Sequence, residues 1–358
     1  MHMGRKSSDD PTRFFYMQGS PGAVPGHFEV LSRNDFIEKM NRRFLYKVGT
    51  DRYESSRIFY EEKVVGMIHE EFPEFEGRIA VGIAGEGSDC FGYDDFMSRD
   101  HDFGTGVCLW LTDEDMDLFG KRLTEEYDRL AYGSGNAGLS ARLRERRGVM
   151  TIRDYYSNIL NIDCDVNGCE ISPEQWRKLD HACLATAVNG EVFRDDLGVF
   201  TAFREMLLAF YPDEIWRERL ADELHRFSAA LQVNYARCMT RKDTVAAQMC
   251  RLEGLKAAME LFFLMKRVYP PYYKWTYRRL AELDTDGKFA AKIRSLAEAG
   301  CAVSFWKDRK YNPDRPNLAD PVVNLTEQIA ADIVQMLRER GLTDGKDPYL
   351  ERYVDEVL

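Results

Sequence analysis

The sequence lacks the features that mark a membrane protein, a nucleic-acid binder or a disulfide-stabilised protein. No apolar run approaches the ~18 residues that a membrane-spanning helix needs. The formal net charge is -11, whereas proteins that bind DNA or RNA usually present a basic surface. The eight cysteines are scattered and form no CxxC motif, and we expect no signal peptide. These absences predict reduced thiols in a cytoplasm, and neither a membrane nor a nucleic acid as partner.

What the sequence does have is the composition of an ordinary globular protein. Of its 358 residues, 44% are hydrophobic and 30% are charged, and this length is sufficient for two domains. We predict an α+β chain with a flexible N-terminal arm over residues 1–27, a mixed sheet with flanking helices over 28–199, and a helical bundle over 200–358. One basic cluster, which includes Arg142, Arg144, Arg146 and Arg147, is expected on a solvated helix face.

The stretch from Arg78 to Thr112 predicts a strand, a glycine-serine turn and a second strand. The second strand, expected over His101–Leu111, has Asp100 and Asp102 at its start. Because successive strand residues point to opposite faces, these two acids project from the same face. Adjacent carboxylates repel one another unless a cation lies between them, and Mg²⁺ prefers carboxylates together with substrate phosphates. Asp100 and Asp102 are therefore candidate metal ligands, the alternative being acids that serve only solubility at a strand entry.

The turn supplies candidate phosphate ligands. Gly85 and Gly87 let the backbone approach a ligand closely. The N–H groups around Ser88, together with its hydroxyl, can form an anion-binding concavity. Ser88 can also cap the turn that follows, and the two roles are compatible.

The remaining elements are predicted from periodicity and from start and stop signals. Thr112 and Ser172 are expected as helix N-caps, the latter in a capping box with Gln175. The stretch Asp163–Glu174 also fits a calcium-loop pattern, but Pro173 beside the last acid favours the helix start. The other predicted strands are Ile79–Ala84, Gly148–Ile152 and Glu191–Arg194, and the predicted helices are Arg33–Leu45, Glu54–Phe72, Asp113–Leu130, Asp222–Tyr235, Thr244–Val268 (the centre of the bundle), Ala290–Ala299 and Leu325–Arg340.

Gly87-Ser88, eleven intervening residues and Asp100-His101-Asp102 resemble the signature of the nucleotidyltransferase superfamily, which includes kanamycin nucleotidyltransferase and DNA polymerase beta. The fuller stretch 85–104 resembles more closely a bacterial family labelled domain of unknown function 4037, a branch of that superfamily. Gly190–Trp216 and Arg267–Trp275 fit the same family, in the same order along the chain.

The resemblance implies an enzyme, of the adenylyltransferase type, that binds a nucleoside triphosphate with Mg²⁺ or Mn²⁺ between its two domains. It would transfer a nucleoside monophosphate to a hydroxyl of a small molecule or of a protein side chain. Asp100 and Asp102 would hold the metal, and Gly87 and Ser88 would grip the phosphates. From the helical domain, Lys274 and Arg204 would lend positive charge to the triphosphate. Otherwise, Lys274 is a lysine that packs its stem among aromatic rings.

The resemblance also implies a third carboxylate on the third strand, and Gly148–Ile152 contains none. Asp154 lies just beyond that strand, and Asp195 and Asp196 follow the later strand Glu191–Arg194. The sequence leaves open which of the three would deprotonate the acceptor or complete a second metal site. The missing acid motivates an alternative hypothesis, a nucleotide-binding or regulatory module without turnover. An interaction protein with the same fold is a third.

Overall fold

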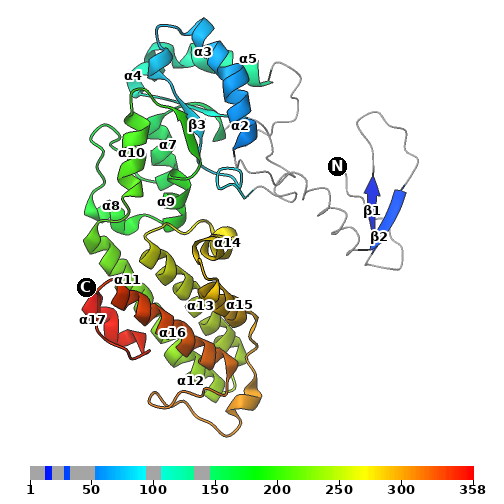
Figure 1. Ribbon diagram of the computed structural model, residues 1–358, viewed down its shortest axis with the longest axis vertical. Coiled ribbons are helices and arrows are strands. Elements are labelled where there is room, and N and C mark those ends of the chain that lie inside the picture. The colour runs from blue at the N-terminus through cyan, green and yellow to red at the C-terminus, as the bar shows by residue number, and fades with distance from the viewer. Residues whose placement is uncertain (1–12, 18–27, 33–52, 94–105, 133–145) are drawn as a thin grey trace.

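The computed structural model describes residues 13–17, 28–32, 53–93, 106–132 and 146–358 (Figure 1). These residues form an α+β structure, as predicted, with many helices and a small mixed sheet. Strands β1 (Arg13–Met17) and β2 (Phe28–Ser32) pair antiparallel in a separate two-stranded ribbon, so part of the range expected as an arm has strand structure. Among the described helices, none has the length and apolar character needed to span a membrane.

The main sheet has four strands in the order β5-β4-β3-β6. The central strand β3 (Ala80–Ile83) pairs antiparallel with β4 (Cys108–Leu111) and β6 (Glu191–Arg194), and β5 (Gly148–Thr151) runs parallel to β4. The register places the carboxyl end of β3 beside the amino ends of β4, β5 and β6. We call this edge of the sheet the turn edge, because the glycine-serine turn follows β3 there.

Each face of the sheet is covered by helices, as the alternation of its residues requires. Val81 and Leu109 pack in one core, and Ala80 and Trp110 pack in the other. The first core is covered by two long helical runs. One consists of α2 (Glu54–Phe59), a π-helical segment (Tyr60–Val64) and α3 (Val65–Glu71). The other consists of α4 (Asp113–Asp115), a π-helical segment (Met116–Gly120) and α5 (Lys121–Tyr132). The second contains α7 (Ile152–Leu160), α8 (Pro173–Lys178), α9 (His181–Ala187) and α10 (Val199–Leu208).

The second core continues without interruption into the helices that follow residue 200. There α13 (Thr244–Lys266) contacts its neighbours on several sides and is the central helix, as predicted. The predicted helix Asp222–Tyr235 is too short. Helical structure runs through α11 (Asp213–Phe227), a π-helical segment (Ser228–Asn234) and α12 (Tyr235–Thr240). Its true start has acids in the first turn after Pro212. The remaining helices are α14 (Tyr273–Leu283), α15 (Lys288–Glu298), α16 (Pro321–Glu339) and α17 (Val354–Val357), with short 3-10 turns at Glu76–Arg78, Val303–Trp306 and Leu350–Tyr353.

Local signals in the sequence set the starts of two helices as predicted. The Thr112 hydroxyl accepts a hydrogen bond from the Asp115 N–H, and Ser172 and Gln175 form the complete capping box. The loop before Ser172 is held by Asp165, whose carboxylate accepts from Gly168 N–H at 2.9 Å. No cluster of three metal-ligating side chains exists within the described residues, so the calcium-loop pattern gains no support.

Gly190 directly precedes β6 and lies against the end of β3, so its replacement tests how closely the two strands approach. Its φ is +70°, and a Cβ at this position would lie 1.8 Å from the carbonyl oxygen of Ile83. We expect Gly190→Ala to lower the free energy of unfolding by at least about 3 kcal/mol, because the clash adds to the cost of a left-handed residue. Gly287 has a similar φ of +69° with nothing within 4 Å. Gly287→Ala should therefore cost only about 1 kcal/mol, and equal losses in urea denaturation would contradict the predicted clash.

Candidate functional site

The turn that follows β3 has a shape that only its glycines allow. Gly85 and Gly87 have φ angles of +102° and +123°. A Cβ on Gly87 would lie 2.2 Å from Oδ1 of Asp89. The carbonyl oxygen of Ser88 accepts hydrogen bonds from the N–H groups of Phe91 (3.2 Å) and Tyr93 (2.8 Å), which closes the turn. The predicted Gly87-Ser88 element is therefore a compact turn at the edge of the sheet.

The segment before β6 holds this turn in place. The Asn189 side chain accepts from the Gly85 N–H at 2.8 Å and donates to the Gly85 carbonyl at 2.7 Å, as a neighbouring strand would. Arg204, predicted to bind nucleotide, donates from Nη2 to the carbonyl oxygens of Val188 (2.7 Å) and Asn189 (3.3 Å). The structure thus places Arg204 behind the segment that holds the turn, where it positions Asn189.

A buried ion pair lies beneath the turn. The Arg147 side chain is only 2% exposed, and its Nη2 lies 2.7 Å from Oδ2 of Asp89. The same nitrogen lies 3.0 Å from the Cys90 sulfur, and Nη1 donates to the carbonyl oxygen of Arg146 at 3.0 Å. The expectation of a solvated helix face is wrong for Arg147, because this residue directly precedes β5 and points beneath the turn. Arg146 remains closer to solvent, 3.1 Å from the exposed Glu86 carboxylate.

The two thiols beside Arg147 are structural. Burial raises the pKa of Cys90 and of Cys108, although the nearby guanidinium acts in the opposite direction. Both thiols therefore stay protonated and unreactive at neutral pH. All eight cysteines lie among the described residues, where they are free thiols.

Helix α14 packs against the turn through Trp275, Arg278 and Glu282. The ring of Tyr93 lies 5.2 Å from that of Trp275, and its hydroxyl donates to Glu282 at 3.0 Å. The Arg278 guanidinium lies 4.4 Å from the centre of the Tyr93 ring. Lys274 is exposed and precedes Arg278 by four residues, so both lie on one side of the helix. The structure thus brings Lys274 to the side of α14 that meets the turn.

Among the candidate acids that the structure describes, Asp154 and Asp196 are not brought together with the turn. Asp154 lies in the first turn of α7, after Thr151, and Asp196 follows β6, where it pairs with Arg194 at 2.5 Å. The register places both positions at the end of the sheet opposite the turn edge. Asp195 accepts from the N–H groups of Gly198 and Thr201 and so caps the start of α10. Asp100 and Asp102 lie outside the described residues. The strand predicted over His101–Leu111 is too long, because Gly106 and Val107 are described outside any strand and β4 begins at Cys108.

One acid at the turn edge escaped the sequence interpretation. Glu191 begins β6, directly opposite Ile83, and its carboxylate forms an ion pair with Arg57 at 2.5 Å. The sequence signal was available, since Glu191 starts a strand that was predicted with its correct bounds. What the sequence could not supply was the antiparallel pairing of β6 with β3, which brings the start of β6 and not its end to the turn.

Residues 176–276 match a family described as Domain of unknown function (DUF4037). This stretch contains Gly190–Trp216 and Arg267–Trp275, and the match supports the resemblance to that family there. The glycine turn lies outside the matched stretch. No curated protein and no solved structure matches the chain.

Proposed function

We propose that the chain is a Mg²⁺-dependent nucleotidyltransferase, which transfers a nucleoside monophosphate from a nucleoside triphosphate to a hydroxyl of a small molecule or protein. The observation that carries the proposal is the glycine turn at the end of β3, with α14 packed against it. Glycines with positive φ and successive N–H groups suit a turn that surrounds phosphate oxygens. The sequence distance further supports the proposal. Asp102 precedes Gly106 by four residues, and Gly106 lies two residues before β4 begins at the turn edge.

In this proposal each residue has a distinct role. Gly87 and Ser88 would hold the terminal phosphates, and Asp100 and Asp102 would hold Mg²⁺, which would supply the positive charge that neutralises them. Lys274 would supply a positive charge from the side of α14 that meets the turn. Tyr272 and Tyr273 are exposed beside it with ring centroids 4.2 Å apart, and they offer a surface on which a base can stack. Positioning and charge neutralisation then supply most of the catalysis.

The alternative is a nucleotide-binding or regulatory module of the same fold that lacks turnover. It is favoured by one observation, namely that Asp154 and Asp196 lie at the opposite end of the sheet from the turn. In the enzyme, a third acid must then come from elsewhere, and Glu191 is at the correct edge. Turnover with radiolabelled nucleotide distinguishes the two functions, because both predict binding.

Nucleotide binding should depend on a divalent cation. We expect calorimetry to detect binding of a purine nucleoside triphosphate in Mg²⁺ or Mn²⁺ but not in EDTA. The reason is that two carboxylates without a metal repel the phosphates. Equal affinity in EDTA would remove the metal from both the enzyme and the module.

Lys274→Ala should weaken binding of the Mg²⁺-triphosphate complex about tenfold, which corresponds to the loss of ~1.4 kcal/mol from one charge contact. Folding should be unchanged, because the side chain is exposed and its ammonium only approaches the Trp275 ring, at 5.0 Å. Lys288→Ala, on the separate helix α15, is the matched control. If both variants bind as the unmodified chain does, Lys274 has no part in the site.

A further inference from the structure

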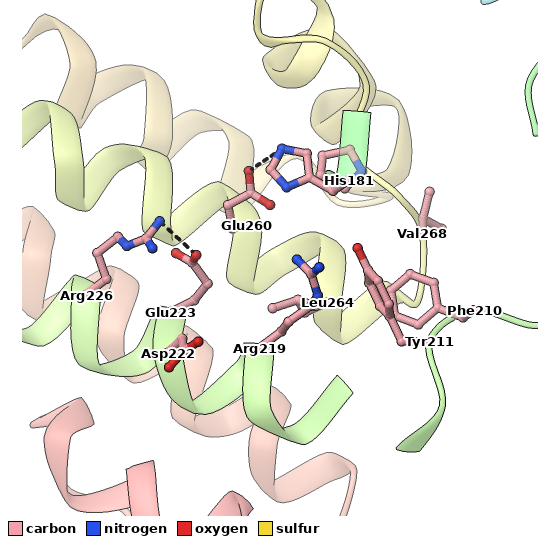
Figure 2. Close-up of a pocket in the computed structure, with 11 residues that line it drawn as sticks. His181, Phe210, Tyr211, Arg219, Asp222, Glu223, Arg226, Glu260, Leu264 and Val268 are labelled. Carbon is pink, nitrogen blue, oxygen red and sulfur yellow. Dashed lines mark ion pairs between the residues drawn. The ribbon is translucent and has the colours of Figure 1, made fainter. Parts of the chain in front are cut away.

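A second site is built into the helices, independently of the proposed nucleotide site. A pocket of about 120 Å³ lies between α9, α11 and α13 (Figure 2). Its polar lining consists mainly of His181, Tyr211, Arg219, Glu223, Arg226 and Glu260. All of these residues lie within 176–276, the stretch that matches the family, whereas the glycine turn does not. We call this the α11/α13 pocket.

Two carboxyls from facing helices reach this pocket, Glu223 from α11 and Glu260 from α13. Their side chains are 13% and 9% exposed. Glu260 Oε1 lies 3.1 Å from His181 Nε2, and Glu223 Oε1 lies 3.0 Å from Arg226 Nη1. Burial raises the pKa of Glu260 to about 8, and the Glu223 charge adds to this shift. Burial also raises the pKa of Glu223, to about 7, although Arg226 opposes it.

The pocket also contains polar atoms that have no partner within the protein. Tyr211 is 4% exposed, and its hydroxyl is buried without a hydrogen bond. Figure 2 shows this hydroxyl pointing into the same space as the Arg219 guanidinium. The Oε2 atom of Glu223 and the Nε atom of Arg219 are likewise buried and unpartnered. Because buried polar atoms are normally hydrogen-bonded, these unpartnered atoms indicate that something else satisfies them.

The free groups favour a cation over an anion. Arg219 donates from Nη2 to the carbonyl oxygens of Trp176 (3.2 Å) and Leu179 (2.6 Å), and its charge lies 4.6 Å from the centre of the Tyr211 ring. Arg226 is engaged by Glu223. Each of the two guanidinium groups therefore already contacts oxygen atoms, with only Nε of Arg219 left without a partner, and an anion would also lie beside the two carboxyls of Glu223 and Glu260. A metal ion is disfavoured, because the described residues contain no group of three metal-ligating side chains.

We propose that the α11/α13 pocket binds a small primary organic ammonium ion, whose charged head lies between Glu223 and Glu260 and donates to the hydroxyl of Tyr211. A primary ammonium has three N–H donors, which matches these three oxygen-bearing groups. Phe210, Leu264 and Val268 line the rest of the pocket and suit an alkyl or aryl body. The ligand replaces protons that the two carboxyls otherwise hold.

This replacement gives binding a definite pH dependence. An alkylammonium keeps its charge to about pH 10, whereas the carboxyls must lose their protons to attract it. Affinity therefore rises between pH 6 and pH 8, with release of protons. The other charged groups around the pair are Asp180 on α9, Arg219 and Asp222 on α11, and Glu253 and Lys256 on α13. Burial lowers the pKa of His181, which favours its neutral form.

The test is calorimetric titration of the full chain with n-butylamine and phenethylamine at pH 6, 7, 8 and 9, in two buffers of different ionisation enthalpy. We expect binding that tightens at least tenfold from pH 6 to pH 8, with protons released to the buffer. Tyr211→Phe should weaken it at least fivefold, and Glu260→Gln at least tenfold. Tyr211→Phe removes a hydroxyl that has no partner in the protein, so this variant keeps the fold.

Two controls make the outcome decisive. Glu298→Gln changes an exposed acid on α15 that does not line the pocket, and it should bind as the unmodified chain does. Sodium butyrate has a similar alkyl body with the opposite charge and should not bind. Tighter binding of butyrate than of n-butylamine would identify an anion site around Arg219 and overturn the inference. So would the absence of heat with either amine at pH 9, or unchanged affinity in both Tyr211→Phe and Glu260→Gln.

Discussion

Asp100→Asn and Asp102→Asn are each expected to lower nucleotidyl transfer by at least about a thousandfold. Asparagine keeps the size of the side chain and removes the charge that holds the metal. Without that metal the charge that develops on the phosphates is not neutralised, and loss of such a contact costs on the order of 4 kcal/mol in the transition state. Each 1.36 kcal/mol is a factor of ten in rate, so about three powers of ten follow.

The assay incubates the chain with nucleoside triphosphates labelled at the α-phosphate and with a cell extract, and detects label on a metabolite or a protein. Asp128→Asn, an exposed acid on α5, is the matched control and should retain full transfer. Thermal unfolding should show little change in either test variant. Label that persists in both would show that the metal ligands lie elsewhere. No label from the unmodified chain with any nucleotide would favour the module without turnover.

The strands of the sheet could be predicted closely because local signals define them. Glu191–Arg194 has its predicted bounds, and Ala80–Ile83 lies within the predicted Ile79–Ala84. The order of the strands was not accessible, because pairing depends on contacts between residues distant in sequence. The directions of β5 and β6 relative to β3 were equally hidden, and they separate Asp154 and Asp196 from the turn and bring Glu191 to it. A list of candidate acids from sequence therefore could not be reduced to one.

Burial of charged side chains was equally hidden from the sequence. Arg147 belongs to an arginine-rich stretch that is typical of a solvated surface, yet the β4–β5 pairing places it beneath the turn. Glu260 lies on the central helix among apolar neighbours, where only the packing of α11 and α9 shows that its carboxyl is buried beside that of Glu223. In both cases the sequence supplied the helix or strand but not the neighbour that determines the charge environment.

The pair formed by Asp89 and Arg147 should lose stability asymmetrically when either partner is replaced. Asp89→Asn leaves a guanidinium that is 2% exposed without its carboxylate, and an uncompensated buried charge of this kind costs about 3–5 kcal/mol.

Arg147→Met instead leaves the Asp89 carboxylate, which is 30% exposed and can be hydrated. The loss of stability from Arg147→Met should be smaller, about 1–2 kcal/mol. It comes mainly from the lost hydrogen bond between Arg147 Nη1 and the carbonyl oxygen of Arg146.

The double variant completes the thermodynamic cycle. Once Arg147 is methionine, Asp89→Asn removes no partner, so the double variant should be about as stable as Arg147→Met alone. Urea denaturation followed by circular dichroism measures the four free energies of unfolding, and the Glu76–Arg194 ion pair at the other end of β3 provides the comparison. There both side chains are more than 20% exposed, so Glu76→Gln should cost much less than Asp89→Asn. If Asp89→Asn costs as little as that, or if the two single changes simply add, the buried pair does not hold the turn against the sheet.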